Sequence, residues 1–273
     1  MAETPPVVGA ALPVHWIAPY RDWLFDKDRD LELQGFHEAA VLEGDWQALA
    51  AQAKKELDGF RGRLGLHGPF WGFTVASEDP AVREIVTRRL MQGLDACAAV
   101  GAVQMVIHSP YTTWDHNNLD NRPDSRDAVI GHARATLAPV LTRAEDQGVQ
   151  LVMENIADVD PAERRRLVEA LGSPALALSI DTGHAHYAHC STGAPPVDYF
   201  VKSAGERLAH MHLQDADGYA DRHWAIGEGT IRWAGVFRAL AALETKPHLV
   251  LELHDKRGIP ASMAWLEAAG LAV

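Results

Sequence analysis

Short runs of apolar and β-branched residues recur along the chain and alternate with longer segments of helical period. Each run is bounded by turn-forming residues, which is typical of a buried strand. We expect eight strands, over residues 7–12, 31–36, 63–68, 103–109, 149–155, 175–181, 207–214 and 248–254.

The segments between these runs carry signals for the start and the end of helices. Asp79 followed by Pro80 is typical of a helix N-terminus. Gly101 and Gly148 stand where helices would end, and Pro139 predicts a kink in the helix before Gly148. We expect helices over residues 45–57, 79–101, 124–148, 160–172, 196–205, 232–243 and 260–270.

Regular alternation of strands and helices predicts a parallel sheet that is buried on both faces. Eight such repeats in 273 residues indicate an α/β fold, a closed (β/α)₈ TIM barrel, as a single domain over residues 1–273. An open doubly wound sheet is the alternative, but the sequence has no G-x-G-x-x-G after the first strand. The longest irregular stretch, 110–125, is expected to be a functional loop.

Composition narrows the class of protein. The formal net charge of −12 argues against broad nucleic-acid binding through a basic face, although a local basic patch stays open. Cys97 and Cys190 form no disulfide framework, which fits a reducing compartment. We see no signal peptide and no apolar run of ~20 residues that could span a bilayer. We therefore expect a cytoplasmic protein with a small-molecule substrate and no membrane partner; its oligomeric state is not predicted.

Imidazole and carboxylate side chains stand at the ends of the last six expected strands, or shortly after them. In a TIM barrel, the C-terminal ends of the strands carry the active site. Nitrogen and carboxylate ligands together suit zinc, manganese or iron rather than calcium. The sequence therefore predicts a metal site on this rim, formed by His67, His108, Glu154, Asp181, His184, His212 and Glu252.

The segment after the seventh expected strand is rich in histidine and acidic residues. Asp221 and His223 stand two positions apart in a D-x-H step that could direct both side chains toward one ion. Gly227 and Gly229 would let the backbone turn back under the site. We interpret this segment as one side of the metal site, and an ordinary polar loop is the alternative.

Other polar residues are interpreted as structural. His210 is expected to be a packed core residue, and His186 and His189 are expected to be exposed loop residues. His254 could support a ligand from behind. The charged run 163–166 is expected to be a solvated helix face.

Six short motifs together resemble those of the xylose-isomerase-like TIM barrels. That superfamily joins sugar isomerases and epimerases to the endonuclease IV group of abasic-site nucleases. The resemblance covers nearly the whole chain and is weakest before residue 60. The motifs are HSPY at 108–111, MEN at 153–155, DTGH at 181–184, HLQD at 212–215, DRH with GEG at 221–229, and LELH at 251–254.

The two branches of this superfamily imply different metal centres. Similarity to the epimerases implies a single manganese or other divalent ion on Glu154, Asp181, His212 and Glu252. Similarity to the endonuclease IV group implies three zinc ions on nine residues. The three ligand sets would be His67, His108 and a shared Glu154; Glu154, Asp181, His212 and Glu252; and His184, Asp221 and His223.

The chain departs from the nuclease pattern outside the metal ligands. The G-x-H-V-S-x-x-G-G opening of the nucleases is missing, and HGPFWGFTVAS at 67–77 replaces their short lesion-entering loop. These departures argue against abasic DNA as the substrate. Aromatic residues suited to stacking on a ligand, and cations suited to neutralising a phosphate, are Trp16, Phe70, Trp71, Tyr111, Trp114, Arg222 and Lys256.

Two enzymatic activities follow from these residues. The first is hydrolysis of a phosphate ester, a small phosphodiester in preference to DNA, because nine ligand positions are filled where four suffice for an epimerase. Glu154 would bridge two metals and Glu252 would fix one of them. The second is isomerisation or epimerisation of a sugar or keto-sugar, with Glu154 and Glu252 exchanging a proton and with His184 and Arg222 binding substrate oxygens. A barrel that only binds metal has no support in the sequence.

Overall fold

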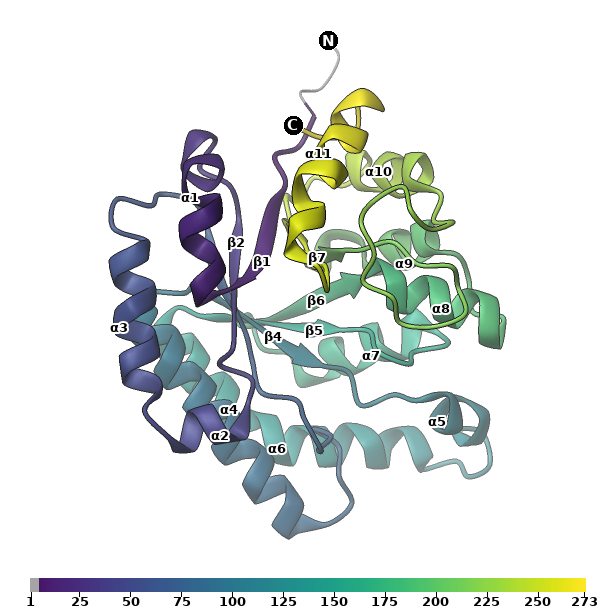
Figure 1. Ribbon diagram of the computed structural model, residues 1–273. Coiled ribbons are helices and arrows are strands. Elements are labelled where there is room, and N and C mark those ends of the chain that lie inside the picture. The colour runs from purple at the N-terminus through teal and green to yellow at the C-terminus, as the bar shows by residue number, and fades with distance from the viewer. Residues whose placement is uncertain (1–4) are drawn as a thin grey trace.

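The computed structural model describes residues 5–273, and they contain a closed barrel of eight parallel strands (Figure 1). Residues 1–4, which the expected domain includes, lie outside the described residues. All eight expected strands are confirmed, with ends shifted by up to three residues. They are β1 Gly9–Pro13, β2 Leu31–Gln34, β3 Leu64–His67, β4 Gln104–His108, β5 Gln150–Glu154, β6 Leu176–Asp181, β7 Leu208–Leu213 and β8 His248–Leu251.

Helices surround this barrel, and the seven that were expected are confirmed. The side chain of Asp79 accepts a hydrogen bond from the backbone N–H of Ala81, and Gly101 ends the same helix with φ of 79°. Short 3₁₀ turns lie at Val14–Trp16, Gly205–Arg207 and Lys256–Gly258. The helices are α1 Ile17–Asp26, α2 Ala39–Glu43, α3 Trp46–Glu56, α4 Pro80–Val100, α5 Thr113–Asn118, α6 Ser125–Gln147, α7 Pro161–Leu171, α8 Thr182–Thr192, α9 Val197–Ala204, α10 Trp233–Ala241 and α11 Ile259–Ala268.

Helix α8 corrects the expected exposed loop around His186 and His189. Its sequence lacks a clear apolar period, but Asp181 caps it by accepting a hydrogen bond from the backbone N–H of His184 at 2.7 Å. His186 is buried on the inner face, where its Nε2 lies 2.7 Å from Thr230 Oγ1. His189 is exposed, as expected, but it lies on a helix.

Part of the long stretch 110–125 is also helical. Thr112 and Asp115 form a reciprocal capping box at the start of α5, and this local pairing stabilises a single short helix after β4. The expectation of a wholly irregular loop is therefore corrected.

Arg164 corrects the expected solvated face at 163–166. Its side chain is 1% exposed and lies 3.2 Å from the carboxylate of Asp158. It also donates hydrogen bonds to the carbonyl oxygens of Met153 and Ser179, so it ties α7 to β5 and β6 from behind. Such an arginine is tolerated in the interior because its donors meet a carboxylate and carbonyl oxygens.

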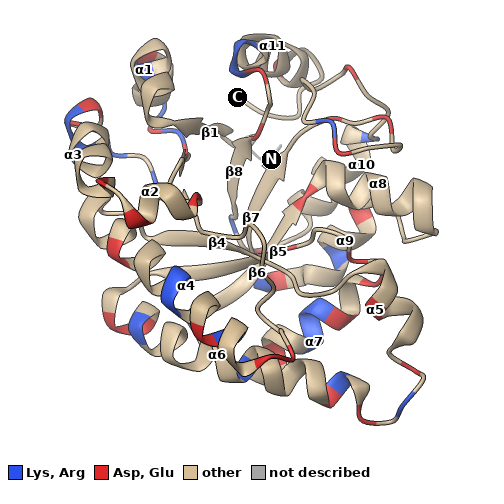
Figure 2. Ribbon diagram, turned by 60° about the horizontal axis from the view of Figure 1, so that its bottom comes forward, with Lys and Arg blue, Asp and Glu red and all other residues tan. Residues whose placement is uncertain are grey.

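The outer surface and the rim of the barrel differ in how their polar residues are distributed. Acidic and basic residues are interspersed along α4, α6 and α7 (Figure 2). None of the helices in residues 5–273 is long and apolar enough to cross a bilayer. On the inner side, strand register brings polar residues together at the C-terminal ends, because His108 pairs with Glu154 and Asp181 pairs with His212.

Candidate metal centre

The first predicted ligand set lies at the ends of β3, β4 and β5. The Nε2 atoms of His67 and His108 lie 3.9 and 3.6 Å from Oε2 of Glu154. Glu154 is fully enclosed, and all three residues offer ligand atoms within 4.8 Å of one another. The structure therefore brings this set together as the sequence predicts.

The second set surrounds His212 on β7. Its Nδ1 lies 2.9 Å from Oε1 of Glu154 and 3.4 Å from Oε2 of Glu252. Asp181, which pairs with His212 in the sheet, completes a buried group of four possible ligands. Glu154 thus directs one oxygen to each of the first two sets.

The third set is held by Asp221 in the loop after β7. One of its oxygens lies 3.4 Å from Nε2 of His184, and the other lies 3.1 Å from Nε2 of His223. Gln214 stiffens this loop, because its amide donates to Asp221 and accepts a hydrogen bond from the backbone N–H of His223. His223 has φ of 49°, an unusual backbone state for a non-glycine residue. The D-x-H step does bring both side chains to one place.

Backbone carbonyls select the free nitrogen in three of the histidines. The Nδ1 atoms of His67, His184 and His223 lie 2.8 to 2.9 Å from the carbonyl oxygens of Gly68, Asn155 and Glu252 respectively. A carbonyl oxygen only accepts, so each Nδ1 carries a proton, and in the neutral ring Nε2 is the nitrogen with the lone pair. A histidine that is bound to a metal needs this arrangement.

Buried carboxylates favour a positive charge at this centre. Burial raises the pKa of Asp181 to about 6, helped by Glu154 and Glu252, although nearby histidines lower it. Burial also opposes protonation of His212, but Glu252, Glu32 and Glu154 raise its pKa well above the ordinary value. Without a metal, protons on the imidazoles would supply the positive charge that these carboxylates need.

The residues present fit divalent metal ions. Among the described residues, Oε2 of Glu154 and Oδ2 of Asp181 are buried oxygens without a hydrogen-bond partner. Neighbouring ligands around a tetrahedral zinc ion lie about 3.4 Å apart, given metal–ligand bonds near 2.0 to 2.1 Å. The separations of 2.9 to 3.9 Å between imidazole nitrogens and carboxylate oxygens in the three sets bracket this value.

Strand β2 contributes two residues that the sequence analysis did not single out. Glu32 lies 2.9 Å from Nε2 of His212, and the amide of Gln34 donates to Oε1 of Glu252 at 2.8 Å. Both alternate with the buried Leu31 and Leu33. Polar residues at every second position of a strand expected to be buried on both faces were the available signal that this face points into the barrel.

Two other histidines have partners that were not expected. His210 is buried, as predicted, but its packing is polar: Nδ1 lies 2.8 Å from Ser179 Oγ and Nε2 lies 3.2 Å from Glu32. The ring of His254 lies 4.6 Å from that of His223, behind the third set.

The fold of this chain has known counterparts. The sequence profile of the xylose isomerase-like TIM barrels matches residues 24–269. The chain belongs to this family.

Two solved structures show how closely this xylose isomerase-like barrel follows known ones. The TTHB071 protein of Thermus thermophilus, from a crystal soaked with zinc chloride, is 30% identical, with a TM-score of 0.71 and 96% of each chain covered. A D-tagatose 3-epimerase-like protein is 19% identical, with a TM-score of 0.74 over 96% of each chain. The second likeness shows the fold alone.

A curated relative connects this barrel to the other branch of the superfamily. "Probable endonuclease 4" of Mycobacterium leprae is 30% identical over 176 residues, which are 61% of this chain and 64% of that protein. The chain spans about 61–64% of the length of the curated relatives that it matches.

The aromatic residues expected to bind substrate differ in exposure. The Phe70 ring stacks on His108 with 4.1 Å between centroids, so it lies directly beside the first ligand set. Trp71 and Trp114 are 67% and 75% exposed, and Trp16 is half-buried against Tyr20. Tyr111 is 4% exposed, which corrects the expectation that its ring faces a ligand.

The two cations that were expected to neutralise a phosphate already have partners within the protein. The guanidinium of Arg222 forms an ion pair with Asp217 at 2.9 Å. The buried ammonium of Lys256 donates to Oε1 of Gln34 at 2.9 Å, and Gln34 in turn donates to Glu252. Lys256 therefore contacts the second ligand set through Gln34.

Proposed function

We propose that this protein is a metal-dependent hydrolase of phosphate esters that holds up to three zinc ions and acts on a small phosphodiester. The observation that carries the proposal is the convergence of nine side chains into three adjoining sets, two of which share Glu154. The second set alone would be enough for a one-metal isomerase. The third set, formed by His184 on α8 and by Asp221 and His223 in the loop after β7, has no use in such an enzyme as a metal site.

The protein residues would hold the metals and shape the reaction. Bound zinc would polarise the phosphate ester and lower the pKa of a water nucleophile. Glu154 would keep the first two ions adjacent, because its oxygens face different ligand sets. Asp221 would join His184 and His223 from one side, and its half-exposed side chain leaves this set accessible to an ester from solvent.

The charge of the site explains why metal would be essential. A phosphodiester is an anion, and the two cations expected to bind it already have partners: Arg222 pairs with Asp217, and Lys256 donates to Gln34. The buried carboxylates would repel the substrate unless a larger positive charge offset them. We therefore expect the metal-free protein to be inactive.

Two relatives support the proposal. One of them, at 30% identity over nearly the whole chain, was crystallised and soaked with zinc chloride. Another bears the name of an endonuclease. Abasic DNA is nevertheless a less suitable substrate, because the segment after His67 departs from the nuclease pattern.

Metal analysis and a substrate panel test the proposal. The protein, purified without chelator, is analysed for metals by inductively coupled plasma mass spectrometry. It is then assayed on bis(p-nitrophenyl) phosphate, cyclic nucleotides, p-nitrophenyl phosphate and a duplex with an abasic site. We expect close to three zinc ions per chain and turnover of the small diesters. A fully loaded, folded protein that hydrolyses no ester in the panel would refute the proposal.

A sugar isomerase is the second candidate, and one observation favours it. Glu154 and Glu252 both contact Nδ1 of His212, at 2.9 and 3.4 Å, so two carboxylates flank one metal position. Such a pair could remove and return a proton on a ketose. Deuterium from solvent would then enter the substrate carbon of a ketose. Zinc content near one ion per chain together with this exchange would favour the isomerase.

A further inference from the structure

His212 presents its nitrogens differently from three of the other candidate ligands. His67, His184 and His223 each donate Nδ1–H to a backbone carbonyl and direct Nε2 toward a carboxylate ligand. In His212 the roles are exchanged, because Nδ1 faces Glu154 and Glu252. Its Nε2 points to the opposite side, into the barrel, where its hydrogen-bond partner among residues 5–273 is a carboxylate and not a backbone carbonyl.

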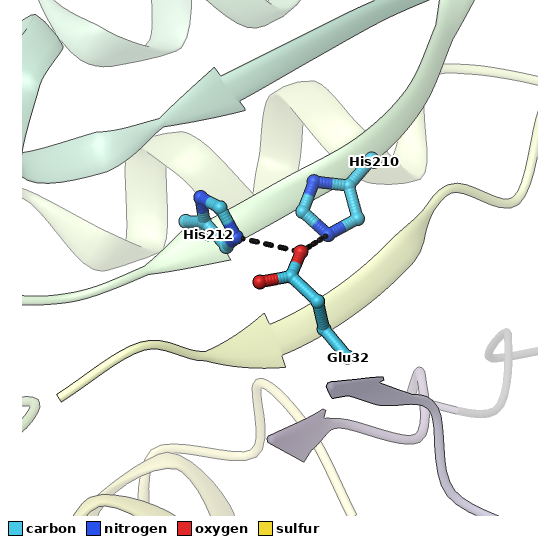
Figure 3. A group of neighbouring side chains, drawn as sticks. All are labelled: Glu32, His210 and His212. Carbon is cyan, nitrogen blue, oxygen red and sulfur yellow. Dashed lines mark hydrogen bonds and ion pairs between the residues drawn. The ribbon is translucent and has the colours of Figure 1, made fainter. Parts of the chain in front are cut away.

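Glu32 occupies that position. Its Oε2 lies 2.9 Å from Nε2 of His212 and 3.2 Å from Nε2 of His210 (Figure 3). Figure 3 shows the carboxylate of Glu32 between the two imidazoles, reaching across from β2 to β7. All three side chains are at least 98% buried, so bulk solvent does not reach this contact.

We infer that Glu32 is a positioning residue: it accepts the Nε2–H of His212 and thereby leaves Nδ1 as the nitrogen that binds metal. Backbone carbonyls perform the same task for His67, His184 and His223, but Glu32 performs it with a charged group. A carboxylate behind a ligating imidazole makes that imidazole a stronger donor and fixes its orientation. The inference rests on the proposed metal site and names the residue that tunes one of its ligands.

His210 and Ser179 hold Glu32 in place. Ser179 Oγ lies 2.8 Å from Nδ1 of His210, and this contact turns Nε2 of His210 toward Glu32. The chain of contacts thus runs from Ser179 through His210 and Glu32 to His212 and ends at Glu154. Its members all lie on strands, which are the most rigid elements of a barrel.

A purely structural role is the rival explanation. Buried ion pairs add little to stability, and well-packed apolar residues often replace them at no cost. Glu32 also has a buried oxygen, Oε1, without a hydrogen-bond partner among the described residues, which is unfavourable for stability. A structural residue would change the unfolding of the metal-free protein and leave metal binding as it was.

The test compares Glu32→Leu and Glu32→Gln with the control Asp30→Asn. Asp30 is a buried carboxylate next to the start of β2, but it pairs with Arg63 and the backbone N–H of Leu249 rather than with a ligand. Zinc affinity is measured by competition with a chromogenic chelator. The visible spectrum of the cobalt-substituted protein reports the ligand geometry, and thermal unfolding with chelator reports stability. Neither metal readout depends on a substrate.

We expect Glu32→Leu to weaken the affinity of one ion by roughly 10- to 100-fold and to change the cobalt spectrum. Glu32→Gln keeps an acceptor without the charge, so its loss should be several-fold and smaller. Asp30→Asn should alter thermal unfolding only. If Glu32→Leu does not fold, the zinc affinity and the cobalt spectrum of Glu32→Gln decide whether Glu32 positions His212.

Two results would overturn the inference. One is a folded Glu32 variant with the zinc affinity and cobalt spectrum of the unmodified protein, and the other is an equal loss of affinity in Asp30→Asn. Either would leave the proposed hydrolase untouched. Unmodified protein that binds no zinc would instead remove the proposed function, and this inference with it.

Discussion

Oε1 of Glu154 lies 2.9 Å from Nδ1 of His212, whereas Oε2 of the same carboxylate faces His67 and His108. One side chain therefore belongs to two ligand sets. Glu154 ends β5, which pairs with β4 on one side and with β6 on the other. Its two oxygens can therefore face ligand sets on both sides of β5.

Replacing Glu154 by glutamine should therefore affect two metal ions together. An amide has one acceptor and no charge, so it cannot serve both sets. We expect metal content to fall from about three ions to about one, and any hydrolysis to fall by roughly 100-fold or more. Mass spectrometry of the metal and the diester assay check this. Glu163→Gln is the control, because Glu163 is a buried carboxylate that pairs with Arg126 on the outside of the barrel. Loss of a single ion in Glu154→Gln would contradict the shared role.

Asp221→Asn should release one ion and leave the fold intact. The Asp221 side chain is 51% exposed and lies on a loop, so the variant should still fold, although the metal-free protein loses the ion pairs of Asp221 with His184 and His223. Metal content should fall by about one ion, because His184 and His223 lose their shared partner. Asp217→Asn, in the same loop, should keep all ions. Unchanged metal content in Asp221→Asn would exclude the third site.

The metal-free protein should lose stability as pH rises above neutrality. Burial lowers the pKa of His223, but Asp221 and Glu252 raise it to about 9. Unfolded histidine titrates near pH ~6.5, so the stabilisation is complete below that pH and disappears as pH passes about 9. Zinc binds neutral imidazole, so the stabilisation that it provides should grow over the same interval. We expect Tm with chelator to drop by roughly 5 °C between these pH values. Identical pH profiles of Tm with zinc and with chelator would contradict this.

Gln34→Leu should destabilise the barrel through two groups at once. Gln34 accepts from Lys256 and donates to Glu252, so its loss leaves a buried ammonium and a carboxylate oxygen without that partner. We expect a cost of about 1 to 3 kcal/mol in denaturant unfolding of the metal-free protein. Adding Lys256→Met should recover part of it, because the unpaired ammonium is then removed. Additive effects in this double-mutant cycle would show that the two residues are not coupled.

Trp71→Ala and Trp114→Ala should change substrate binding without changing stability. Both rings are mostly exposed, Trp71 beside Phe70 and Trp114 on α5, so neither contributes much to stability. If they stack on the ligand, each loss should raise KM several-fold, at about 1 kcal/mol per ring, with kcat less affected. Tyr199→Ala on α9, which is 51% exposed, is the matched control. Unchanged KM in both tryptophan variants would remove these residues from the binding site.

Some features could be predicted because they depend on local patterns. The alternation of apolar runs and helical segments was enough for eight strands, and caps such as Asp79 defined helix ends. Helix α8 could not be predicted in this way, because Asp181 and tertiary burial stabilise it rather than an apolar period. The prediction that Arg164 is solvated was wrong for a related reason. Its burial depends on backbone carbonyls of β5 and β6, which only the folded chain brings next to it.

The sequence by itself determined the barrel and the side chains available as ligands, because strand ends in a parallel barrel must meet at one rim. Only the tertiary structure decided how those side chains divide into sets, since that depends on strand register and on which oxygen or nitrogen points where. It also revealed Glu32 and Gln34, whose partners His212 and Glu252 lie about two hundred residues away in the sequence. Contacts across a closed barrel have no local signature, so closure itself places β2 behind the metal centre.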